Sequence, residues 1–203
     1  MWTIPNALTF TRLIAAAILP LGYVVLAHPY SDALAFVLFT AASLTDFLDG
    51  WLARRWGQTT ALGRLLDPIA DKAMVAVALL VLCGLYGASW VVLVPAAIIM
   101  VREFAVSGLR EFLADKKVIM PSSVLAKWKT TVQMTAIAVL LLALYLNFAG
   151  YQTTCIVCGR PALGMVDLFG VALLWLSALM TAITGYQYFA RGMGTIVAAE
   201  KAG

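Results

Sequence analysis

Six long apolar stretches, separated by short polar segments, constrain this chain more than any other feature of its sequence. They lie near residues 7–27, 33–54, 64–86, 89–112, 126–147 and 163–190. Each is long enough to cross a hydrocarbon layer of about 30 Å, for which a helix needs about 20 residues. Helices suit such spans because their backbone groups are hydrogen-bonded internally. The sequence therefore predicts an all-α polytopic membrane protein with six transmembrane helices, in one domain over residues 1–203.

The composition excludes a soluble globular domain. Hydrophobic residues make up 63% of the 203 residues and charged residues 12%, whereas soluble domains have about 45–50% and about 25%. The N-terminal segment has no basic region before its apolar stretch, and Arg12 interrupts that stretch, so we expect no cleaved signal peptide. Asn6 is of a type that caps helices, which predicts a first helix beginning near Ala7.

The placement of Lys and Arg predicts the orientation. With six spans, the side that carries both termini also carries most basic residues: Arg54, Arg55, Arg64, Arg110, Lys116, Lys117, Lys127, Lys129, Arg191 and Lys201. The opposite loops carry only Arg160. By the positive-inside rule, both termini face the cytoplasm. Because the charges follow the membrane face, a nucleic-acid partner is not expected.

Three cysteines give little information about function. Cys83 lies inside an apolar stretch and is interpreted as a packing residue. Cys155 and Cys158 lie in a loop assigned to the outer side, where a disulfide is permitted. Their role stays open.

Four aspartates are the candidate functional site. Asp46 and Asp49 are three residues apart at the end of the second stretch, and Asp67 and Asp71 are four apart at the start of the third. Each pair therefore projects from one helix face. A short connection makes the two helices antiparallel neighbours, so the pairs are expected to converge. Small residues nearby, Gly50, Ala53 and Gly63, leave room for a close helix or a bulky ligand.

A metal site explains these carboxylates best. Buried carboxylates cost several kcal/mol each in a membrane, and four of them also repel one another. One or two divalent cations would remove both penalties, and oxygen ligands favour Mg²⁺, Mn²⁺ or Ca²⁺. Such carboxylate-bridged ions promote phosphoryl and phosphodiester chemistry. The alternative is a set of helix-end acids paired with Arg54, Arg64 and Lys72, which fits one or two acids better than four.

The segment from Asp46 to Asp71 resembles the signature of the CDP-alcohol phosphotransferases, D-x2-D-G-x2-A-R-x8-G-x3-D-x3-D. It is matched without a gap by Asp46, Asp49, Gly50, Ala53, Arg54, Gly63, Asp67 and Asp71. This family consists of integral membrane enzymes of phospholipid synthesis with six transmembrane helices, and its members are typically dimeric. The resemblance implies that the chain is such an enzyme and forms a homodimer.

The resemblance also implies residue roles. The four aspartates would bind two divalent cations, Mg²⁺ or Mn²⁺, and Asp71 would be the general base. The CDP part of the donor would contact or be accommodated by Asn6, Thr9, Asp49, Gly50, Ala53, Arg54, Thr60 and Gly63.

Basic residues on the same membrane face are candidates for binding an acceptor that carries its own phosphate. They are Arg110, Lys127, Lys129 and Arg191, the last placed after the sixth span. For each one alone, ordinary positive-inside anchoring is an equal interpretation. Glu103, inside the fourth stretch, is interpreted as part of an interhelical or helix-end ion pair, and Lys72 as charge balance.

A narrower resemblance concerns the acceptor. The segments Ile4–Arg12, Arg102–Glu111 and Lys127–Met134 are similar to those of the bacterial phosphatidylglycerophosphate synthases. This implies a bacterial inner-membrane enzyme that transfers the phosphatidyl group of CDP-diacylglycerol to sn-glycerol 3-phosphate. The alternatives are another acceptor, such as inositol phosphate, serine or diacylglycerol, and a cation transporter that uses the aspartates as a permeation site.

Overall fold

The computed structural model describes residues 4–56, 61–115, 124–150 and 164–200, and excludes the side chains at 4, 5, 47–56, 61, 62, 64, 115, 124, 127 and 195–200. The described residues form six helices and no strand: α1 (Ile4–Val25), α2 (Tyr30–Trp56), α3 (Ala61–Leu85), α4 (Trp90–Asp115), α5 (Val124–Phe148) and α6 (Met165–Glu200). The predicted all-α fold is confirmed. Thr60, Cys155 and Cys158 lie outside the described residues.

Five of the six helices are long and apolar enough to cross a membrane. Within the described residues these spans are Asn6–Val25, Leu65–Leu85, Trp90–Ala114, Trp128–Phe148 and Met165–Gly194. α2 is the exception, and its side chains are described only as far as Asp46. The spans agree with five of the six predicted apolar stretches, so the chain is a membrane protein.

Two predicted boundaries are wrong. The first helix begins at Ile4, and Asn6 is a buried residue inside it rather than its cap. The physical reason is Pro5, which fits the first turn of a helix because it has no backbone N–H to leave unsatisfied. The last helix continues to Glu200, so Arg191 lies within α6 and not after it.

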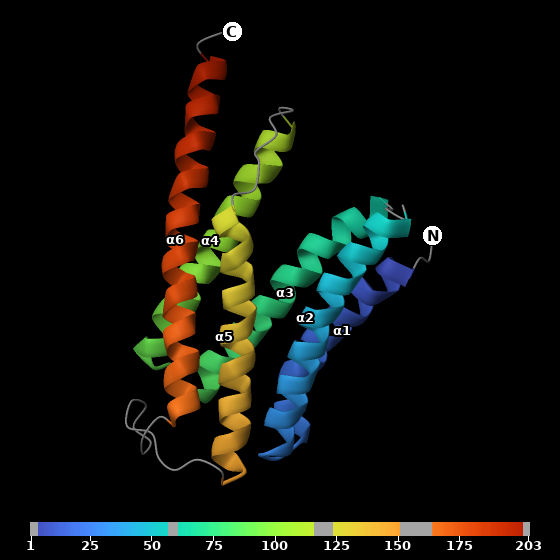
Figure 1. The fold of residues 1–203 in the computed structure, drawn as a ribbon, viewed down its shortest axis with the longest axis vertical. Coiled ribbons are helices and arrows are strands. Elements are labelled where there is room, and N and C mark those ends of the chain that lie inside the picture. The colour runs from blue at the N-terminus through green and yellow to red at the C-terminus, as the bar shows by residue number, and fades with distance from the viewer. Residues whose placement is uncertain (1–3, 57–60, 116–123, 151–163, 201–203) are drawn as a thin grey trace.

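The helices form two groups of three (Figure 1). In one group α1 packs against both α2 and α3, while α2 and α3 hardly touch each other. In the other group α6 packs against both α4 and α5. The contact between α2 and α5 is the main connection between the groups. The start of α1 and the end of α6 lie at the same end of the molecule, where α4 and α6 project farthest (Figure 1).

At the end of the molecule opposite to the start of α1, hydrogen bonds within and between segments hold the helix ends. After α3, the Gly87 N–H donates to the Gly84 carbonyl at 3.1 Å and the Ala88 N–H to the Cys83 carbonyl at 2.7 Å. This pair of bonds is a Schellman motif, and Gly87 supplies the positive φ of 65° that the motif needs. The fully buried Asp167 of α6 accepts hydrogen bonds from Tyr86, the residue after α3, at 2.5 Å and from Asn147 of α5 at 3.0 Å, and thereby links the end of α3 with α5 and α6.

Between the two ends lies an apolar core. Leu19, Phe39, Leu79, Leu82 and Leu140 are among its fully buried side chains, contributed by α1, α2, α3 and α5. The polar residues described next lie on the side of this core where α1 begins.

Candidate active site

The four aspartates lie on two helices near the end where α1 begins. Asp46 and Asp49 belong to the last turns of α2, and Asp67 and Asp71 to the first turns of α3. The side chain of Asp49 is outside the described residues. The sequence predicts that α2 and α3 are direct neighbours, but the two helices have few contacts with each other. Instead α1 packs against both of them and links the two aspartate pairs.

A polar stripe on α1 faces these carboxylates. Asn6, Thr9 and Arg12 recur at every third position and are only 1–3% exposed, because this spacing keeps them on one face of a helix. The Thr9 hydroxyl donates to Asp67 Oδ1 at 2.5 Å, and Arg12 Nη1 donates to Asp46 Oδ1 at 2.5 Å. α1 therefore holds one carboxylate of each pair in place.

Asp71 lies deeper and is half-buried. Its charge is repelled by Asp46 and Glu103 and attracted by Arg12 and Lys129. It lines a small cavity where α3, α4 and α5 meet, together with Lys72, Val75, Met100, Glu103, Phe104, Lys129, Thr130, Gln133 and Met134. Within the described structure, this cavity brings the candidate base Asp71 together with polar side chains from α3, α4 and α5.

Among the candidates for binding the phosphate of the acceptor substrate, Lys129 is the only one whose described side chain lines this cavity. It is 4% exposed and forms an ion pair with Glu103 of α4. The interpretation of Glu103 as part of an interhelical ion pair is therefore confirmed. Lys72 donates a hydrogen bond to Ser107 on α4, and its role in charge balance stays a prediction.

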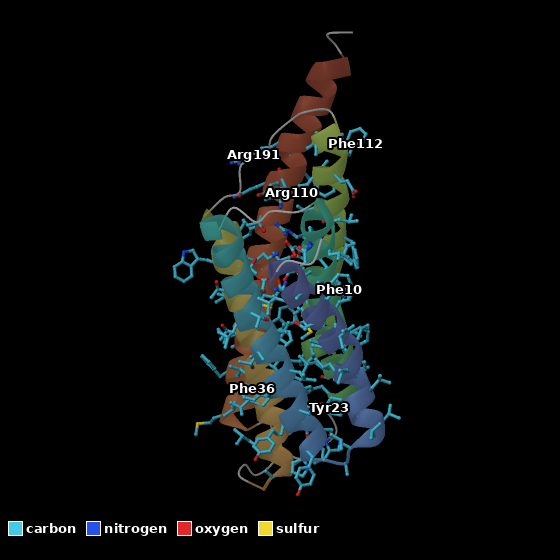
Figure 2. The ribbon with its side chains drawn as sticks, turned by 90° about the vertical axis from the view of Figure 1, so that its right-hand side faces the viewer. Phe10, Tyr23, Phe36, Arg110, Phe112 and Arg191 are labelled. Atoms are coloured by element: carbon cyan, nitrogen blue, oxygen red, sulfur yellow. The ribbon has the colours of Figure 1, made fainter. Side chains whose placement is uncertain are left out.

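The other acceptor candidates lie elsewhere. Arg110 of α4 and Arg191 of α6 are exposed, and both lie toward the end of the bundle where α1 begins, whereas Tyr23 and Phe36 lie toward the opposite end (Figure 2). Lys127 belongs to α5, but its side chain is outside the described residues. The proposal of a shared phosphate pocket stays a prediction.

Half of the donor-contact candidates lie in the last turns of α2, where the side chains are outside the described residues. Gly50, Ala53 and Arg54 belong to α2, without described side chains, and Gly63 is buried in α3. Asn6 and Thr9 are also buried, and the hydroxyl of Thr9 is engaged by Asp67.

Sequence reasoning missed three residues of this site: Arg12 as the partner of Asp46, and Glu103 and Gln133 beside Asp71. A usable signal existed for Arg12, because it continues the three-residue spacing of Asn6 and Thr9. For Glu103 and Gln133 the signal was weaker, since each is a polar residue within an otherwise apolar helix.

The chemistry of the aspartate oxygens, rather than a grouping among the described side chains, suits a hard divalent cation. Among the described side chains, no three His, Cys, Asp or Glu residues are grouped closely enough to hold an ion. The described Asp46 and Asp67 instead use their oxygens to accept hydrogen bonds from Arg12 and Thr9. Carboxylate oxygens are the ligands that Mg²⁺ and Mn²⁺ prefer, and Asp49 belongs to the same turn of helix as Asp46.

Comparisons with known proteins show the family to which the chain is related. The family model described as CDP-alcohol phosphatidyltransferase matches residues 2–183. Three similar proteins carry the name CDP-diacylglycerol–glycerol-3-phosphate 3-phosphatidyltransferase. The one from Cereibacter sphaeroides is 40% identical, with 95% of this chain and 96% of that protein covered. The one from Rickettsia bellii is 41% identical, covering 92% and 93%. The one from Salmonella typhimurium is 36% identical, covering 97% and 98%.

Proposed function

Because the chain belongs to the CDP-alcohol phosphatidyltransferase family, we propose that it transfers the phosphatidyl group of CDP-diacylglycerol to sn-glycerol 3-phosphate. The products are phosphatidylglycerol phosphate and CMP. The observation that supports this most directly is structural: α1 holds Asp46 and Asp67 by Arg12 and Thr9, while Asp71 lines a polar cavity beside them. The names of the relatives supply the donor and the acceptor.

In this proposal Asp71 is the general base. It takes the proton from the primary hydroxyl of glycerol 3-phosphate. The hydroxyl oxygen then forms a bond to the β-phosphorus of CDP-diacylglycerol, and the bond from this phosphorus to the bridging oxygen breaks to release CMP. A covalent enzyme intermediate is not needed, because Asp71 acts on the acceptor directly.

Asp46, Asp49, Asp67 and Asp71 would hold two divalent cations, Mg²⁺ or Mn²⁺. When bound, such ions neutralise phosphate oxygens and stabilise the leaving group. The chain's own contribution is to hold the ligands: Arg12 balances the charge of Asp46, and Thr9 orients Asp67. Arg54 would add a fixed positive charge for the diphosphate.

The basic residues support an orientation with both termini and the active site in the cytoplasm of a bacterial cell, in its inner membrane. The acyl chains of the donor would remain in the bilayer. We also propose a homodimer, which the family resemblance implies and which the mass of the detergent-solubilised protein can test.

The experiment is CMP release by the purified protein with CDP-diacylglycerol and glycerol 3-phosphate, with and without Mg²⁺ or Mn²⁺. Labelled glycerol 3-phosphate should enter the lipid product, and inositol phosphate, serine or diacylglycerol should not compete for it. A preference for one of those acceptors would refute the choice of acceptor. CMP release that survives Asp71→Asn would refute the role of Asp71 as the base.

A cation transporter would need a polar path from the aspartates to the other face. Between the aspartates and the opposite end of the bundle, the described core is filled by apolar side chains that are 0–2% exposed, among them Leu19, Phe39, Met74 and Leu79. No observation on the described residues favours this second function.

A further inference from the structure

The cavity beside Asp71 is too small for a whole substrate but large enough for one of its groups. Its volume is about 20 Å³, and a cavity of roughly 10–15 Å³ by this measure already holds one water molecule. A group the size of a single hydroxyl therefore fits, whereas a sugar ring or a phosphate does not fit without rearrangement of the walls.

Gln133 lines this cavity and carries a buried hydrogen-bond acceptor without a described partner. Its side chain is 3% exposed, and Gln133 Oε1 has no hydrogen-bond partner among the described residues. Three other polar side chains of the wall are engaged, since Lys129 pairs with Glu103 and Lys72 donates to Ser107. A buried acceptor without a donor is unfavourable and rare in folded proteins. The arrangement therefore calls for a small donor in the cavity.

The spacing of residues along α5 places Gln133 on the same helix face as Lys129. Gln133 lies one helical turn after Lys129, so both side chains are on the same face of α5. That face meets Asp71 of α3 and Glu103 of α4 at the cavity. A donor in contact with Gln133 Oε1 is consequently a close neighbour of the carboxylate assigned as the base.

We propose that this cavity receives the secondary hydroxyl of glycerol 3-phosphate and that Gln133 Oε1 accepts its hydrogen bond. The inference rests on the proposed function. The primary and secondary hydroxyls sit on adjacent carbons, so the secondary hydroxyl in the cavity directs the primary hydroxyl to Asp71. Gln133 is thus a specificity-determining residue for the acceptor, and the phosphate of the acceptor remains outside the cavity.

The test compares two acceptors that differ by one hydroxyl. The probe is 3-hydroxypropyl phosphate, which has the phosphate and the primary hydroxyl of glycerol 3-phosphate but lacks the secondary hydroxyl. With the wild-type protein we expect kcat/KM for CMP release to be at least about tenfold higher for glycerol 3-phosphate, because the probe leaves Gln133 Oε1 without a donor. Gln133→Met keeps the size of the side chain and removes its acceptor. It should lower kcat/KM for glycerol 3-phosphate to near the value for the probe, and leave the value for the probe within about threefold.

Thr135→Val is the matched control. Thr135 lies on the same helix, is exposed, and donates to the carbonyl of Thr131 in its own helix at 2.8 Å. This variant should retain the wild-type rates and the wild-type preference. Activity of Gln133→Met on the probe that stays within about threefold of the wild-type value also shows that the variant is folded.

Two results would overturn the inference: a wild-type protein that uses both acceptors equally well, or a Gln133→Met variant that loses activity on both by the same factor. The second result assigns the cavity to a structural water or to packing. Both differ from failure of the proposed function, in which the wild-type protein releases no CMP with either acceptor.

Discussion

Thr9→Val tests directly whether α1 positions the aspartates. Valine has nearly the shape of threonine but cannot donate to Asp67, so the substitution removes the 2.5 Å hydrogen bond. A hydrogen bond to a charged group contributes about 1.5–3 kcal/mol. Because Asp67 is exposed, water replaces part of this interaction, and we expect a net loss of about 1–2 kcal/mol. That loss corresponds to a decrease of roughly 5- to 30-fold in kcat/KM.

The assay is CMP release over a series of Mg²⁺ concentrations. A less well oriented Asp67 should raise the Mg²⁺ concentration for half-maximal rate several-fold, whereas loss of a direct contact with the nucleotide would raise only the KM for CDP-diacylglycerol. Thr9→Ser keeps the hydroxyl and should restore most of the activity.

Thr11→Val is the control for Thr9→Val, because Thr11 is exposed on the same helix and donates to the carbonyl of Leu8 at 2.8 Å. We expect it to behave as the wild type. If Thr9→Val and Thr11→Val have the same activity and the same Mg²⁺ dependence within about twofold, the hydrogen bond to Asp67 does not position the site, and the reasoning is refuted.

Three further predictions concern charge, metal and packing. Arg12→Met should lower kcat/KM by at least about tenfold, because Asp46 loses its charge-assisted hydrogen bond; wild-type kinetics would show that Asp46 needs no partner. Chelation of divalent ions by EDTA should abolish CMP release, and Mn²⁺ should restore it; activity that persists in EDTA contradicts the metal site. Gly170→Ala should reduce the free energy of unfolding by about 1–3 kcal/mol, measured as a lower thermal midpoint in detergent, because its Cβ would lie 2.8 Å from Leu140 Cγ. Gly108→Ala is the control, since a Cβ there meets nothing within 4 Å.

The sequence alone determined the helices and the chemical character of the site. Hydropathy and length are local properties of a segment, so they located the helices, although Pro5 moved the first boundary to Ile4. The aspartate spacing also depends only on helix geometry, which is why Asp46 and Asp49, and likewise Asp67 and Asp71, could each be assigned to one helix face before their surroundings were known.

Only the tertiary structure decided which faces meet. Membrane helices are apolar on most sides, so hydropathy does not say which neighbour each face contacts. The position of α1 against both α2 and α3 therefore could not be predicted, and with it the partners that Arg12 and Thr9 provide for the carboxylates. For the same reason, the meeting of Gln133 with Asp71 required the packing of α3, α4 and α5, because these residues are far apart in the sequence and each belongs to a different helix.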